Sequence, residues 1–132
     1  MKLVVLLPYT PYAVPVSARS SLNMTPNARN RRRFPDTKAR EQMHSDAYYL
    51  TREASAYQGV KFEADDPLEM RIVCRSKVSR QRDDDNLIAG LKWARDGIAT
   101  ALGVDDNQFR VQPPEFEKGW LNETEITITR AV

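Results

Sequence analysis

The sequence predicts an α+β domain in which a small mixed β-sheet packs against two main helices. Two strand-like stretches alternate apolar and polar residues with period two, and two helix-like stretches repeat apolar residues every three or four positions. Their order along the chain is strand, irregular arm, helix, strand, helix, strand, strand. With 132 residues, the chain is long enough for a single domain, 1–132, with one core.

The first strand and the arm that follows it differ sharply in composition. Lys2–Leu7 is a short apolar run that predicts a buried strand, whereas residues 8–35 hold five of the eight prolines. Between residues 17 and 40 there are seven basic residues and one acid. We therefore expect residues 9–35 to form an irregular basic arm that becomes ordered on a polyphosphate partner. The alternative is a mobile, solvated loop.

Both helices have recognisable ends. Asp36 or Thr37 can cap the first, and Gly59 is placed to end it. The second is expected at about Asn86–Leu102, with Gly103 as its C-terminal stop. Its apolar residues lie on one side of the helix, and the polar residues Asp85, Lys92 and Asp96 align on the other.

The remaining strands follow from alternation. Leu68 to Arg75 and Glu123–Thr129 each show one apolar face, and Gln108–Gln112 is a shorter strand candidate. Pro113–Lys118 is expected to be a loop that separates the last two strands. Cys74 then belongs to the core, and His44, on the first helix, is a surface or packing residue.

Composition excludes several classes of protein. One cysteine and one histidine are too few for a disulfide framework, a zinc ribbon or a histidine-based triad within one chain. No apolar run approaches the roughly 18 residues of a membrane span, so we expect a cytoplasmic protein without a membrane partner. Any catalysis must therefore depend on carboxylates, lysine or a metal ion.

Asp83, Asp84, Asp85 and Asn86 form the most informative motif. They directly follow a segment, Arg71 to Arg82, with five basic residues and no acid. Two like charges about 4 Å apart repel by about 4 kcal/mol near a protein surface, whereas a helix N-terminus returns only about 0.3 to 1 kcal/mol per acid. A bound divalent cation would account for the rest of the cluster.

Magnesium is the cation that these residues suit best, with manganese as the alternative. It takes oxygen ligands, usually from one or two carboxylates, with water and phosphate completing the shell. Asp83 and Asp85 can share such an ion, and Asp106 is the candidate third ligand. Lys92 is placed to offset charge that develops on a phosphate oxygen.

Each part of this motif also has a structural interpretation. Asp83 or Asp85 can serve as an N-cap, and Lys92 with Asp96 as a surface pair. Asp105 and Asp106 are typical of a turn. Taken singly, Asp96 and Asp105 favour the structural interpretation. An EF-hand is excluded, because no glutamate closes a 12-residue loop after Asp85.

The run Arg80-Gln81-Arg82-Asp83-Asp84-Asp85-Asn86-Leu87, followed by Lys92, Asp96 and Asp105-Asp106, resembles the RusA-type Holliday junction resolvases of bacteria and phages. In that family a basic run precedes Asp-x-Asp-Asn, a lysine and an aspartate follow on the helix, and an Asp-Asp pair precedes the next strand. The resemblance covers about Arg80 to Val111, and the first and last strands also fit the family outline.

The resemblance implies a homodimeric, magnesium-dependent endonuclease that resolves four-way DNA junctions in recombination and repair by symmetric paired nicking. Asp83, Asp85 and Asp106 match the family's essential acids and metal ligands, and Lys92 matches its essential lysine. That lysine follows Asp85 by seven residues here, whereas the family spacing is nearer four, where Ala89 stands. The arginines expected to contact the DNA backbone are Arg29, Arg31, Arg32, Arg33, Arg80 and Arg82.

Three further expectations concern how such a protein would work. A two-fold dimer presents two equivalent sites to the two strands of a junction. The second helix should be about 25 Å long, which separates Asp106 from Asp85 and predicts a site shared between subunits. Tyr9, Tyr12 and Phe34 would either stack on unpaired bases or pack over the arm's prolines.

The alternative functions are an inactive junction-binding accessory protein of the same fold and a metal-binding module without affinity for DNA.

Overall fold

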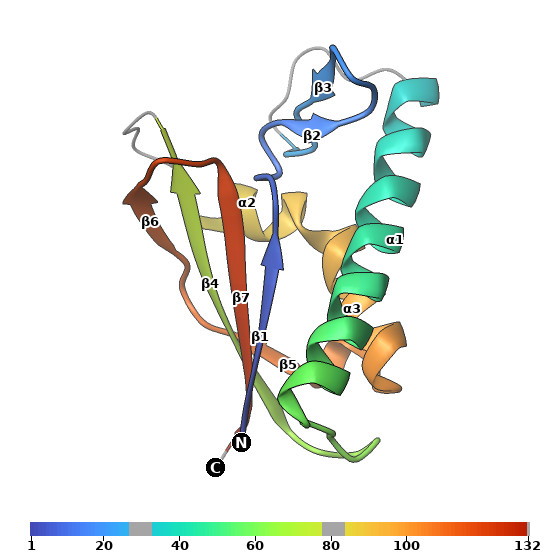
Figure 1. Cartoon of the computed structure of the whole chain (residues 1–132), viewed down its shortest axis with the longest axis vertical. Helices are drawn as coiled ribbons and strands as arrows, with labels where there is room; N and C mark the ends of the chain where they lie inside the picture. The colour runs from blue at the N-terminus through green and yellow to red at the C-terminus, as the bar shows by residue number, and fades with distance from the viewer. Residues whose placement is uncertain (27–32, 78–83, 132) are drawn as a thin grey trace.

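A computed structural model describes residues 1–26, 33–77 and 84–131, and of residues 33–36 only the backbone. Within these residues the predicted α+β class is confirmed: a five-stranded sheet forms one layer, and two long helices cover one of its faces (Figure 1). None of the helices in the described residues is long and apolar enough to cross a bilayer.

The sheet is built around β4 (Leu68–Ser76) and β7 (Glu123–Arg130), which pair antiparallel along their length. β1 (Lys2–Leu7) adds antiparallel to the outer side of β7. On the other side of β4, β5 (Phe109–Val111) and β6 (Glu115–Lys118) pair parallel with its first and second halves in turn. The sheet is therefore mixed, as the sequence predicts.

β6 corrects one expectation. Glu115–Lys118 lies in the stretch that the sequence predicts to be a loop, yet it is paired with Val73 to Ser76. The unpaired backbone groups along the outer edge of β4 supply a template for a strand. The paired prolines only separate β6 from β5, so pairing across the sheet overrides a weak local preference.

The opposite edge of the sheet is closed by a side chain. Gln58, the last residue of α1 (Arg33–Gln58), donates from Nε2 to the Val4 carbonyl (2.9 Å) and accepts from the Val4 amide (3.0 Å). Its amide thus imitates a neighbouring strand on the outer edge of β1. Gly59 follows with a φ of 66° and ends the helix where the sequence predicts.

The second predicted helix is divided into α2 (Asp84–Gly90) and α3 (Lys92–Leu102). Leu91 adopts φ −95° and ψ 7°, and its amide is shared between the carbonyls of Leu87 and Ile88. A single uninterrupted helix from Asn86 is therefore wrong, although hydrogen bonding resumes at once with the Arg95 amide bonded to the Leu91 carbonyl. Because Leu91 is fully buried, packing of its side chain accompanies the break.

The core lies between the sheet and the helices α1 and α3. The helices approach closely at Gly97, where an added Cβ would overlap the His44 carbonyl oxygen and approach the Ala47 Cβ to 3.2 Å. Cys74 is buried and His44 is half-buried, as the sequence predicts. The largest fully buried side chains are Leu3, Leu7, Met24, Met43, Leu68, Met70, Ile72, Leu87, Leu91, Ile98, Ile126 and Ile128.

The first part of the predicted arm is folded. Within residues 9–26, β2 (Val14–Pro15) and β3 (Ser21–Leu22) form a small hairpin. The Met24 amide donates to the Pro11 carbonyl (2.8 Å), and Met24 is fully buried. The expectation of an irregular arm throughout 9–35 is therefore wrong for this part, because its few apolar residues find places in the core.

Candidate metal and nucleic-acid site

The acidic motif is partly described. Asp84 and Asp85 form the exposed first turn of α2, whereas Asp83 lies outside the described residues. Negative charge near a helix N-terminus is favourable, because the helix dipole is positive at that end. The described part of the motif thus presents two solvent-accessible, hard oxygen donors that suit magnesium.

The folded part of the arm fixes the position of α2. A Cβ on Gly90 would lie 3.0 Å from both Pro11 Cβ and Thr25 Cγ2, so the end of α2 lies directly on this segment. Thr25 is itself held by Asn23, whose Oδ1 accepts from the Thr25 hydroxyl at 2.6 Å and from its amide at 3.0 Å. Residues 9–26 therefore support the helix that carries Asp85.

Tyr9 has a structural place. It is 5% exposed, and its hydroxyl donates to Asp46 Oδ2 on α1 at 2.8 Å. Burial, followed by the hydrogen bond to Asp46, raises the pKa of the Tyr9 hydroxyl far above its usual value. The stacking role considered for Tyr9 is therefore wrong. Tyr12 packs partly buried against the core, which favours the packing alternative, and the Phe34 side chain lies outside the description.

Lys92 is the exposed first residue of α3, immediately after the break at Leu91. Asp96 is half-buried one turn later, and its carbonyl accepts from the Thr100 hydroxyl at 2.9 Å. Lys92 is exposed at the start of the helix that follows α2, and α2 carries the described acids of the motif. It can meet an anion there without losing a place in the core.

Asp105 and Asp106 have different surroundings. Asp105 caps the 3₁₀ helix η1 (Asp106–Gln108), accepting from the Asn107 amide at 3.1 Å, while Gln108 Oε1 accepts from the Asp105 amide at 2.8 Å. This capping box confirms the structural interpretation of Asp105. Asp106 is exposed at the first position of the same helix.

Asp85 and Asp106 lie toward opposite ends of the two layers. Asp106 precedes β5, whose Phe109 pairs with the first residue of β4, whereas α2 follows the other end of β4 (Figure 1). α3 intervenes with 11 residues, about 16 Å at 1.5 Å per residue. Among the residues that the structure describes, no group of three or more His, Cys, Asp or Glu side chains could hold a metal ion.

The six arginines expected to contact DNA are almost entirely undescribed. Only the backbone of Arg33 is described. It is the first residue of α1, which therefore begins three residues before Asp36, the first of the two predicted caps. The other five, with Asp83, lie in the parts of the chain that the structure does not describe: Arg29, Arg31, Arg32, Arg80 and Arg82.

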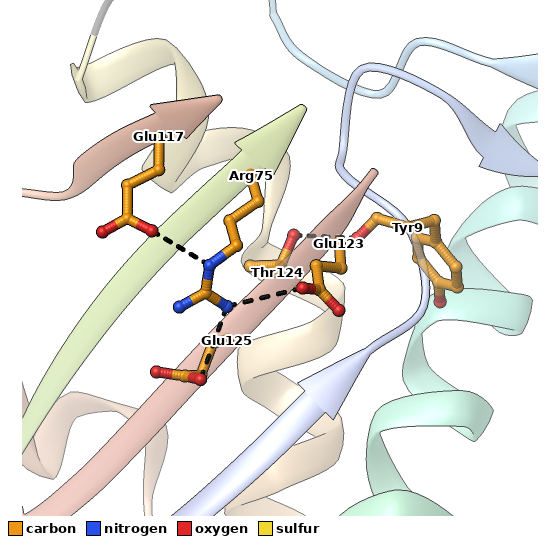
Figure 2. A network of polar contacts seen from close by, with 6 residues as sticks. All are labelled: Tyr9, Arg75, Glu117, Glu123, Thr124 and Glu125. Atoms are coloured by element: carbon orange, nitrogen blue, oxygen red, sulfur yellow. Dashed lines mark hydrogen bonds and ion pairs between the residues drawn. The ribbon is translucent and has the colours of Figure 1, made fainter. Parts of the chain in front are cut away.

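Arg75 is a site residue that sequence analysis did not single out. On the open face of the sheet its guanidinium contacts Glu117 Oε2 at 3.0 Å, Glu125 Oε1 at 3.4 Å and Glu123 Oε1 at 3.6 Å (Figure 2). The hydrogen bond to Glu117 is the main cause of the raised pKa of Arg75. Arg75 belongs to the basic run of the sequence, but its guanidinium is paired with these three carboxylates. The registers of β4 with β6 and β7 create this cluster, and no sequence pattern signals it.

Comparison with known proteins identifies a relative but no matching family model. A search against protein-family models finds no match. An uncharacterized protein of Xylella fastidiosa (strain Temecula1 / ATCC 700964) is 35% identical over 113 residues, which are 83% of this chain and 71% of the relative. The chain belongs to the family of this Xylella protein. The shared region is large enough to include most of the fold described above.

Proposed function

We propose that the chain is a homodimeric, RusA-like endonuclease that cuts four-way DNA junctions with the help of magnesium. The observation that carries the proposal is the motif from Asp83 to Asn86, which directly follows a basic run and whose Asp84 and Asp85 form the first turn of α2. The exposed carboxylates of Asp84 and Asp85 support it, because they are accessible to an ion and to a phosphate.

Each residue has a role in this proposal. Asp83, Asp85 and Asp106 would hold magnesium. The ion would polarise the phosphate that is cut and activate a water molecule as the nucleophile at neutral pH. Lys92, exposed at the start of α3, would bind the nonbridging oxygens of the same phosphate and offset their growing charge. Arg29, Arg31, Arg32, Arg33, Arg80 and Arg82 would hold the DNA backbone without reading its sequence.

The separation of Asp85 from Asp106 favours a site shared between subunits. With α3 between these two carboxylates, one ion would more readily collect ligands from two chains related by a two-fold axis. A dimer also supplies two cuts with the symmetry of the junction, as paired nicking requires.

Strand-resolved cleavage of a synthetic four-way junction tests the proposal. With magnesium present, we expect paired nicks in strands of like polarity and little cutting of linear duplex of the same sequence. Asp85→Asn should lower cleavage more than about 100-fold, since even residues that merely orient metal ligands matter by about 10- to 100-fold. Asp65→Asn, which removes an exposed carboxylate elsewhere, is the matched control. A wild-type protein that leaves junctions intact, with either magnesium or manganese, contradicts the nuclease.

A second candidate is an inactive accessory protein that binds junctions. The position of Lys92, seven residues after Asp85 and beyond the break at Leu91, favours it. It predicts salt-dependent binding of junctions, unchanged by Asp85→Asn, and no nicks. A metal-binding module of a different class predicts no affinity for DNA at any salt concentration.

A further inference from the structure

The segment Gly119 to Asn122 bridges the end of β4. β6 and β7 lie on opposite sides of β4, so the residues that join them must cross its C-terminal end. Two hydrogen bonds fix the crossing: the Gly119 amide donates to the Ser76 carbonyl (2.9 Å), and the Lys77 amide donates to Asn122 Oδ1 (2.9 Å). This bridge is therefore held at both of its ends.

The bridge presents its apolar residues to solvent. Trp120 is 95% exposed and its neighbour Leu121 is 62% exposed. An indole is one of the largest apolar groups in a protein, and it is normally at least partly covered. The other tryptophan, Trp93, is half-buried against the core and lies under Arg40, whose Cζ is 4.8 Å from the ring centroid.

Charge around the bridge favours a nucleic acid as its partner. Lys77 and Lys118 are exposed immediately beside it, and Lys77 belongs to the basic run that leads to the acidic motif. Below the bridge, the open face of the sheet carries Glu117, Glu123 and Glu125 around Arg75 (Figure 2), and further along it Glu69 and Glu115 accompany Lys2 and Arg71. Phosphates would be attracted to the end of the sheet and repelled from its open face.

We propose that Trp120 is a stacking platform for an unpaired base of the DNA, with Leu121 covering the edge of that base. The inference rests on the proposed function, and it adds a residue that neither the acidic motif nor the arm includes. An indole can stack on any base, because every base has a flat π-face. That face is accessible only when the base is unpaired and outside the duplex. Trp120 would thus favour branched or single-stranded DNA over continuous duplex.

Binding measurements on substituted proteins test the platform. For Trp120→Ala we expect about tenfold weaker binding to a four-way junction and to an oligo(dT) strand, because the unpaired base loses the ring on which it stacks. Binding to linear duplex should change less than twofold. Trp120→Tyr should retain binding close to wild type, and Tyr57→Ala, which removes a 92% exposed aromatic from the end of α1, is the matched control.

Fluorescence gives an independent reading. In a Trp93→Phe protein, Trp120 is the remaining tryptophan, and oligo(dT) should quench its emission. Unchanged emission, together with wild-type affinity of Trp120→Ala for all three DNAs, overturns the platform while leaving the nuclease proposal intact. A Trp120→Ala protein that binds DNA normally but dissociates into monomers in sedimentation also overturns it, since Trp120 would then be a subunit contact. A wild-type protein without affinity for junctions removes both proposals.

Discussion

The two ends of the sheet differ in how completely their polar groups are used. At the end where β4 begins, Arg130 Nη2 contacts Asp66 Oδ2 (3.0 Å), Gln108 Nε2 donates to the Asp66 carbonyl (3.0 Å), and the Asp105 box closes η1. At the end where β4 finishes, Asp85, Lys77 and Trp120 face solvent. Side-chain contacts connect Asp66, Gln108 and Arg130 at the first end, although Asp106 is exposed there, whereas the second end exposes an acid, a lysine and an indole that a partner could contact.

The difference between the two ends matters for the candidate metal site, because Asp85 and Asp106 lie at different ends. Asp106 lies at the end where β4 begins, next to a capping box that explains its neighbour Asp105 without any ligand. Asp85 lies at the end that is rich in unused groups. If one ion needs both, the joining of two chains must bring unlike ends together. The predictions below break or sharpen this comparison, beginning with the largest effect.

Mixing two inactive variants tests whether the ends meet between subunits. We expect Asp85→Ala and Asp106→Ala each to abolish junction cleavage, and their mixture to regain nicking of one strand. In a shared site, a heterodimer has one intact site and one doubly substituted site. The measurement is strand-resolved cleavage after co-refolding, with each variant alone as its control. A mixture that stays inactive would instead mean that each chain supplies all its own ligands.

Gly97→Ala tests the close contact between α3 and α1, the two helices that cover the sheet between its ends. The new methyl group would overlap the His44 carbonyl oxygen, so α3 must move away from α1. We expect the free energy of unfolding to fall by about 1 to 3 kcal/mol in urea denaturation. Gly119→Ala is the matched control, because its Cβ would meet Arg75 Cβ at 3.4 Å, an ordinary contact. Equal stability of the two variants would contradict the close crossing.

Arg75→Met removes the cation that Glu117, Glu123 and Glu125 share on the open face of the sheet. Repulsion among Glu117, Glu123 and Glu125 should then lower the free energy of unfolding by about 1 kcal/mol, and less in high salt. Adding Glu125→Gln should restore part of the loss. Arg71→Met, on the same strand and face, is the control and should change stability by less than about 0.5 kcal/mol. A loss that does not depend on salt would argue for packing instead of charge.

Asp66→Asn tests the end where β4 begins by its pH dependence. The Glu63 amide (2.8 Å from Oδ2) chiefly lowers the pKa of Asp66, with Arg130 adding to the effect. A lowered pKa means that the carboxylate stabilises the fold above its unfolded pKa of about 3.9 and that this contribution fades as the pH falls through the folded value. Wild type should therefore exceed Asp66→Asn in stability at pH 7, and the gap should close toward pH 2. Urea denaturation of the two proteins at pH 7 and at pH 2 measures this gap, and a gap of the same size at both pH values would contradict the role of the carboxylate.

The sequence predicts those parts of the fold that depend on residues close together in the chain, and it misses those that depend on residues far apart in the chain. Strands β1, β4 and β7 and the end of α1 at Gly59 are confirmed, because apolar alternation and a glycine stop act over a few residues. β6 was missed, since Pro113 and Pro114 dominate its local pattern while its stability comes from the edge of β4. The break at Leu91 is not predicted either, because the apolar helical period continues through it.

For the candidate site, the sequence by itself determined which groups are available: the acids from Asp83 to Asp85, the basic residues around them, and Asp106. Spacing along the chain suffices for that, because charge and donor type belong to the residue. Only the tertiary structure decided that Arg75 is occupied by three carboxylates, that Tyr9 is a buried tie to Asp46, and that Trp120 faces solvent on a fixed bridge. Those outcomes depend on strand register and on which side of β4 each strand lies, which bring together residues tens of positions apart.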